Sequence, residues 1–175
     1  FCQSASFCKS IRKEEVKLRG SASFLALQSS SFESRERTYR THMKGCTQLV
    51  DGDPSSLIVS ESVAMPGLEP TELLIRVSCA GINQLDLMQL RGGCKVPEGV
   101  SEVPGLEVSG TVVQVGKRCS KGFREGDDVM ALLPGGGYAE FVSADERCVM
   151  PCVPGLTQAE NASIPEAFIT AYGLL

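Results

Sequence analysis

The stretch LEVSGTVVQVG, residues 106–116, decides the fold class, because it is the longest run of strand-like sequence in the chain. Gly110 inside it predicts a β-bulge or a close approach of another backbone. Shorter segments of the same kind, with β-branched or alternating apolar residues, lie at 55–67, 72–82, 123–133 and 136–144. Five or more strands at this spacing predict an antiparallel sheet or barrel that begins near Met43.

The end of the chain changes to a helical pattern. Thr157 and Glu160 form a T-x-x-E capping box, which satisfies the free N–H groups of a first helical turn. Pro165 then interrupts the pattern, and because proline is tolerated in a first turn, a second helix is expected over about residues 164–175. We expect this helix to lead into further protein.

Residues 1–42 differ from the rest in composition. They hold eight of the 17 Lys and Arg but only four of the 21 Asp and Glu, and they show no sustained apolar period. We expect a disordered extension, with an organellar transit segment as the alternative, although the four acidic residues count against it. The acidic remainder argues against nucleic acid or an anionic membrane as partner, and no apolar run approaches the roughly 18 residues of a membrane span.

The eight cysteines do not predict a disulfide scaffold or a zinc site. They contain no C-x-x-C pair, and the only histidine, His42, lies outside the expected body of the domain. Zinc requires three or four clustered ligands. We therefore expect reduced thiols, with Cys148 and Cys152 buried in an extended segment.

The glycines at residues 135–137 raise the question of phosphate binding. They join two expected strands, whereas a dinucleotide fingerprint follows a strand and opens a helix. A flexible hairpin is the favoured interpretation, and the lining of a cleft is the alternative. Glu107 lies in apolar surroundings, where an ionised carboxylate needs a partner. A structural ion pair with an arginine is expected there rather than a proton donor or base.

The stretch CAGINQLDLMQLRGG, residues 79–93, places a polar residue where a strand gives way to a helix. The spacing predicts Asn83 as the helix N-cap and Asp86 at the third helical position, with Leu85 and Met88 facing inward. Gly92 or Gly93 would end the helix. A ligand contact through Asn83 is the second interpretation that the spacing allows.

Four motifs, GINQLDL, VPGLEVSGTVVQVG, FREGDDVMALLPGGGYAEF and PEAFITAYGLL, follow one another in the order found in medium-chain dehydrogenases/reductases. Residues 43–175 resemble the N-terminal part of the zinc-independent, zeta-crystallin-like NADPH:quinone oxidoreductases. The resemblance implies a mainly β fold, a GroES-like partly open β-barrel with short helices over residues 43–156. A helical segment, residues 157–175, would then lead into an α/β Rossmann domain.

The resemblance also implies site residues. In the quinone reductases the residues matching Asn83 and Thr170 lie at the nicotinamide end of NADPH. Zinc-dependent relatives place a cysteine where this chain has Asn83 and a histidine where it has Leu106, so no metal is expected. Many relatives have a tyrosine near the quinone at the position that corresponds here to Cys94.

The substrate cleft implied by the resemblance is lined by Cys94, Gly136, Gly137 and Tyr138. The expected activity is hydride transfer from NADPH to a quinone or an α,β-unsaturated carbonyl, by a cytoplasmic homodimer or homotetramer. A mitochondrial or other organellar location would follow if residues 1–42 were a transit segment. The alternatives are an enoyl-thioester reductase and a non-catalytic structural or interaction module.

Overall fold

The computed structural model describes residues 40–174. Most of the segment expected to be disordered, residues 1–42, therefore lies outside the described residues. Within the described part, the first strand already begins at His42, one residue before the boundary expected from the sequence. Among the described residues, no helix has both the length and the apolar character needed to cross a membrane.

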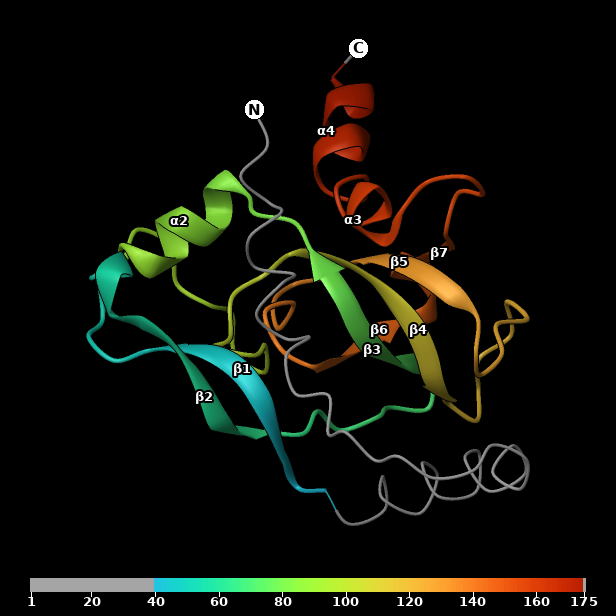
Figure 1. Ribbon diagram of the computed structural model, residues 1–175, viewed down its shortest axis with the longest axis horizontal. Helices are drawn as coiled ribbons and strands as arrows, with labels where there is room; N and C mark the ends of the chain where they lie inside the picture. Colours follow the sequence, from blue (N-terminus) through green and yellow to red (C-terminus); the bar gives the residue numbers. More distant parts are fainter. Residues whose placement is uncertain (1–39, 175) are drawn as a thin grey trace, which may run out of the picture.

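A five-stranded antiparallel sheet forms the centre of the molecule (Figure 1). Its order is β6-β3-β4-β5-β7. The strands are β3 (Glu72–Ala80), β4 (Glu107–Val115), β5 (Asp128–Leu132), β6 (Phe141–Asp145) and β7 (Val149–Pro151). The mainly β, antiparallel fold expected from the sequence is confirmed, and the two edges of this sheet do not pair with each other.

A second sheet of two strands extends one side of the first. It consists of β1 (His42–Gln48) and β2 (Leu57–Ala64), which are joined through the short 3-10 helix η1 (Pro54–Ser56). The N–H of Cys46 in β1 donates to the carbonyl of Tyr138 at 2.8 Å, and Gly45 forms a bridge with Ala139. These contacts join β1 to the segment before β6, which makes the whole a partly open barrel.

The core lies where the alternating apolar residues of the five strands meet. Its buried members are Leu73, Ile75, Val108, Val112, Val129, Ala131, Leu133, Val142, Ala144 and Val149. Burying each of the larger side chains contributes about 1.5–3 kcal/mol. Gly110 lies opposite β3 where the register shifts between Val77 and Cys79, and a Cβ at this position would collide with the carbonyl of Arg76. The predicted close approach is confirmed.

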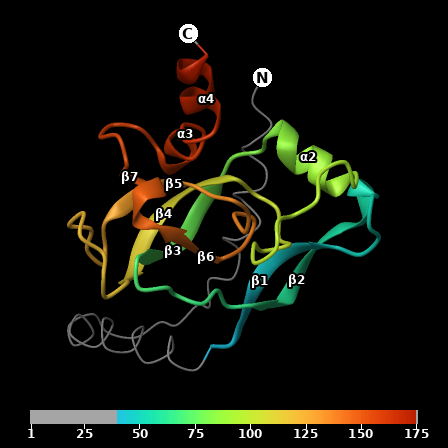
Figure 2. The ribbon, with the colours of Figure 1, turned by 180° about the vertical axis from the view of Figure 1, so that it is seen from behind.

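Three short α-helices complete the described part of the fold. They are α2 (Gln84–Leu90), α3 (Gln158–Asn161) and α4 (Ala167–Gly173). The predicted capping box starts α3, since the N–H of Thr157 donates to Glu160 Oε2 at 2.8 Å and the N–H of Glu160 donates to Thr157 Oγ1 at 3.2 Å. Figures 1 and 2 show that α2 and the α3–α4 pair lie at the same end of the sheet, at the carboxyl end of β3.

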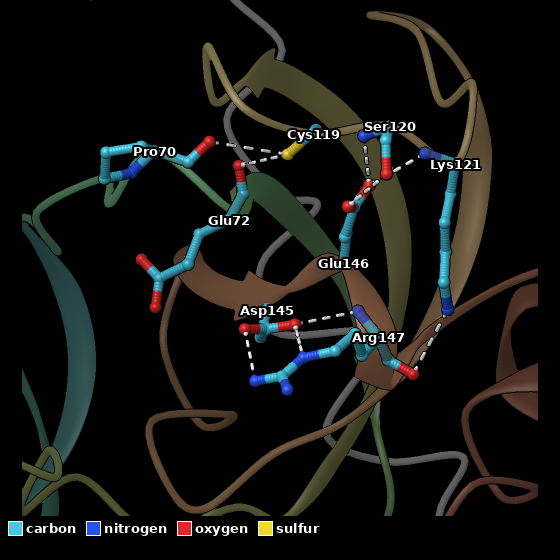
Figure 3. A network of polar contacts seen from close by, with 8 residues as sticks. All are labelled: Pro70, Glu72, Cys119, Ser120, Lys121, Asp145, Glu146 and Arg147. Atoms are coloured by element: carbon cyan, nitrogen blue, oxygen red, sulfur yellow. Dashed lines mark hydrogen bonds and ion pairs between the residues drawn. The ribbon is translucent and has the colours of Figure 1, made fainter.

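The opposite region of the barrel is held by a polar network around Glu146 (Figure 3). Glu146 belongs to the 3-10 helix η2 (Glu146–Cys148) and is buried. Its carboxylate accepts the backbone N–H groups of Ser120 at 2.8 Å and Lys121 at 2.9 Å. These bonds fasten the long β4–β5 connection to η2, and they lower the pKa of the Glu146 carboxyl, chiefly through the N–H of Lys121.

Candidate functional site

Asn83 lies between the end of β3 and the first turn of α2. It is the N-cap residue, as predicted, and its backbone N–H donates to Asp86 Oδ2 at 2.8 Å. Its side chain faces the backbone N–H of Asp86 without forming a hydrogen bond to the first turn. The amide instead donates from Nδ2 to Glu107 Oε1 at 3.0 Å. The cap position is therefore confirmed, while the side chain is directed toward the neighbouring strand β4.

Asp86 is almost completely buried, with 1% of its surface exposed. Besides Asn83, its carboxylate accepts the N–H of Gly105 at 3.0 Å and the hydroxyl of Tyr138 at 2.8 Å. The prediction that Leu85 and Met88 face inward is wrong, because they are 45% and 40% exposed. The inward residues of α2 are Asp86 and Leu90, and the Asp86 carboxylate satisfies these three donors.

Glu107, the first residue of β4, is 2% exposed. Oε1 accepts from Asn83, and Oε2 accepts the backbone N–H of Glu166 at 2.9 Å. The partners of the carboxylate are thus two N–H donors and not the arginine expected from the sequence. Burial raises the pKa of the Glu107 carboxyl, and the two hydrogen bonds oppose this rise.

Gly81 is the reason that Glu107 can lie where it does. A Cβ at Gly81 would lie 2.6 Å from Cδ of Glu107, well inside van der Waals contact. The N–H of Gly81 also donates to the backbone carbonyl of Glu107 at 3.1 Å. The glycine of the GIN motif therefore gives the buried carboxylate the space it occupies beside Asn83.

The glycine loop at residues 135–137 is not the flexible hairpin that the sequence favoured. It joins β5 to β6, and these strands are separated in the sheet by β4 and β3. All three glycines are buried. The N–H of Gly136 donates to Val103 O at 2.7 Å and that of Gly137 to Gly105 O at 3.0 Å. The loop is a packed crossover held to residues 103–105, and the N–H of Gly105 in turn donates to Asp86 of α2.

Tyr138 ends this crossover and points its hydroxyl at the start of α2. The hydroxyl lies 2.8 Å from Asp86 Oδ2 and 3.1 Å from Gly81 O, and its single proton is shared between these two acceptors. Burial, and then the negative charge of Asp86, raise the pKa of Tyr138 far above its ordinary value. The hydroxyl is therefore engaged within the protein and unsuited to deliver a proton near neutral pH.

The remaining residues expected at the site lie farther out. Thr170 is on α4, four residues after Glu166, and it is exposed. Cys94 is also exposed, in the segment after α2, and its Sγ approaches the carbonyl of Lys95 at 3.9 Å. Among the described residues, the hydrogen-bond network joins Asn83 to Tyr138 through Asp86, and to the start of α4 through Glu107, but does not include Cys94.

Sequence reasoning missed the donors that surround Asp86 and Glu107 at the centre of this network. The signal was present, because each is a carboxylate among apolar and glycine residues, and such a group must find donors when buried. The donors to these two carboxylates come from segments distant in sequence, such as Gly105, Tyr138 and Glu166, so spacing alone could not identify them.

No group of three or more His, Cys, Asp or Glu side chains within residues 40–174 is arranged to hold a metal ion. All six cysteines in this range are free thiols, and Cys46 is buried among them. Of the two thiols that the sequence predicted to be buried, Cys148 is exposed, because it ends η2 at the surface, and Cys152 is only half-buried. Two open hollows within the described residues lie elsewhere, around Phe123 and Pro151.

Comparison with known proteins places this arrangement in a family. Residues 69–155 match the alcohol dehydrogenase GroES-like domain family. The chloroplastic quinone-oxidoreductase homolog of Spinacia oleracea is 34% identical over 118 residues, which are 65% of this chain and 36% of that protein. The 2-methylene-furan-3-one reductase of Solanum lycopersicum is 32% identical over 142 residues, 75% of this chain and 36% of that protein.

The fold has solved counterparts. The crystal structure of the human synaptic vesicle membrane protein VAT-1 homolog-like protein superimposes with a TM-score of 0.69 at 33% identity, covering 77% of this chain and 43% of that one. The chain thus spans less than half the length of the relatives it matches. Sequence and fold together assign it to the medium-chain dehydrogenase/reductase superfamily, of which it carries the GroES-like domain.

Proposed function

We propose that this chain forms the barrel part of an NADPH-dependent reductase that transfers hydride to a quinone or to an α,β-unsaturated carbonyl compound. One observation carries the proposal. The amide of Asn83 and the first turn of α4, which leads to Thr170, meet at the buried carboxylate of Glu107. Two candidate cofactor contacts from separate segments are thereby tied to one point at the carboxyl end of β3.

The residues present suit the nicotinamide end of a dinucleotide. Asn83 is half-buried and offers an amide whose position is fixed by hydrogen bonds, and Thr170 offers an exposed hydroxyl. Thr170 follows Glu166 by one helical turn, about 6 Å along the axis and on the same face of α4. Amide and hydroxyl groups are what a carboxamide and a ribose can hydrogen bond.

NADPH would supply the hydride, and the work of this chain is to bind, orient and exclude water. Asn83 and Thr170 would position the nicotinamide end, and the packed crossover of Gly136, Gly137 and Tyr138 would form the wall of the cleft. Because the Tyr138 hydroxyl is engaged with Asp86, the barrel does not offer it as an acid. The proton that completes the reduction would come from water or from outside this barrel.

The names of the relatives support both substrate classes, since one is a quinone-oxidoreductase homolog and another a 2-methylene-furan-3-one reductase. Cys94, at the place where many relatives have a tyrosine, would leave more room beside a substrate. We therefore propose that small enones are accepted alongside quinones. The NADPH-binding Rossmann domain, and a homodimeric or homotetrameric assembly, belong to the same proposal for the whole protein.

The test uses the product of the complete reading frame that contains these 175 residues. Purified protein is mixed with NADPH and either a small quinone or a small enone, and NADPH oxidation is followed by absorbance. Oxidation that requires one of these acceptors supports the proposal. A protein that neither binds NADPH nor oxidises it with either acceptor would refute the proposal. That result would favour a non-catalytic module. The 175-residue chain alone should show no turnover.

A further inference from the structure

We infer that Glu107 is a positioning residue: its buried carboxylate orients the Asn83 amide and holds the first turn of α4 against the barrel, so that both candidate cofactor contacts keep a common geometry. The inference rests on the proposed function for its cofactor. It is argued from two hydrogen bonds, from Asn83 Nδ2 to Oε1 of Glu107 and from the N–H of Glu166 to Oε2 of Glu107.

The geometry sets the direction of the amide. An ionised carboxylate can only accept hydrogen bonds, so the nitrogen of the Asn83 side chain, and not its oxygen, must face Glu107. The oxygen is then left on the side of α2, where the side chain faces the N–H of Asp86. Both atoms of the amide are thus assigned by their neighbours, and a ligand would meet a side chain that needs no reorientation on binding.

The same carboxylate fixes the second element. α4 has no buried residue of its own and exposes most of its side chains. The bond from the N–H of Glu166 to Oε2 of Glu107 joins its N-cap residue directly to β4 at 2.9 Å. Loss of this bond would remove the hydrogen bond that ties the start of α4, the helix that carries Thr170, to β4.

Glu107 is not placed there for stability alone. A carboxylate with 2% exposure is costly to keep ionised, and the charged and titratable groups that face it do not neutralise it. They are Asp86 from α2, Glu166 at the start of α4, and Tyr138 from the crossover. An apolar residue would pack this position at a lower cost but would leave the Asn83 amide and the Glu166 N–H without a partner.

The decisive experiment needs no cofactor. In a pH titration of the 175-residue chain by nitrogen–proton NMR, the side-chain NH₂ of Asn83 and the backbone N–H of Glu166 should move with one common midpoint. That midpoint should lie above the ordinary glutamate pKa of about 4.3. Glu107→Gln should remove the shared step from both signals. Glu166→Gln keeps the backbone N–H and should leave the step in place.

The matched control is Glu125→Gln, which changes an exposed glutamate in the β4–β5 connection and should leave both signals unchanged. Separate midpoints for Asn83 and Glu166, or a shared step that survives Glu107→Gln, would overturn the inference. If Glu107→Gln does not fold, the titrations of the unmodified chain and of Glu166→Gln test the inference, because neither requires a change at Glu107.

A second measurement concerns the cofactor in the complete protein. Asn83→Ala and Glu107→Gln should each weaken NADPH binding about tenfold. The double variant should lose little more affinity than either single variant, since each substitution already disrupts the same oriented Asn83 amide. Additive losses would show that Glu107 does not act through Asn83. If the Asn83 and Glu166 signals titrate together but the complete protein binds no NADPH, the proposed function is refuted, while the two hydrogen bonds to Glu107 are established.

Discussion

Replacing Asp86 by asparagine should be among the most damaging conservative changes in this domain. The carboxylate is 1% exposed and accepts three hydrogen bonds, from the N–H groups of Asn83 and Gly105 and from the hydroxyl of Tyr138. Asparagine has the same shape but only one accepting oxygen. Its NH₂ group would therefore face at least one of these buried donors.

The magnitude follows from the positions of the two oxygens. If the amide oxygen takes the place of Oδ2, it keeps Asn83 and Tyr138, and the NH₂ group faces the N–H of Gly105. The unpaired donor costs about 2 kcal/mol, and the loss of charge from two remaining bonds costs about 0.5 kcal/mol each. We expect a loss of about 3 kcal/mol in the free energy of unfolding, or about 10 °C in Tm.

Thermal unfolding of the 175-residue chain, followed by circular dichroism, checks this value. Tyr138→Phe removes one of the three bonds and should cost about 1.5 kcal/mol. Asp51→Asn, at an exposed position in the β1–β2 connection, is the control and should leave Tm unchanged. If Asp86→Asn lowered Tm by no more than about 2 °C, the three hydrogen bonds would not hold the start of α2 as described.

Further outcomes can be measured on the same chain. Gly81→Ala should lower the free energy of unfolding by about 2–3 kcal/mol in chemical denaturation, because the new Cβ would collide with Glu107. Gly67→Ala is the control and should be neutral, since Gly67 has open space around it. Equal effects of the two substitutions would refute the close packing at Gly81. Because the pKa of Glu146 is lowered, its contribution to stability is complete above about pH 4.3 and is lost as the pH falls. Glu146→Gln should therefore flatten the acid side of a curve of Tm against pH. An unchanged slope would contradict the network of Figure 3. Burial raises the pKa of Cys46, so iodoacetamide followed by mass spectrometry should label it after the exposed thiols; early labelling would show that β1 opens.

Strands and helix starts were predictable because their signals are local. The strand segments that became β3 and β4, the close approach at Gly110 and the capping box at Thr157 each depend on neighbours within a few residues, and the structure confirms all of them. The glycine crossover was mistaken for a hairpin because two strands adjacent in sequence usually pair. Here β5 and β6 pair with other strands, and this choice depends on contacts across the whole sheet.

The sequence by itself determined the mainly β fold, the position of Asn83 at a helix start and the motifs that indicate the superfamily, because short-range periodicity and capping chemistry specify them. Only the tertiary structure decided what faces inward on α2 and what Glu107 contacts. Helical spacing placed Leu85 and Met88 inside, yet the inward side of α2 holds Asp86, which accepts from Gly105 and Tyr138. The N–H of Glu166 is paired by Glu107 of β4. Buried donors from distant segments must be paired, and that requirement outweighs the local apolar pattern.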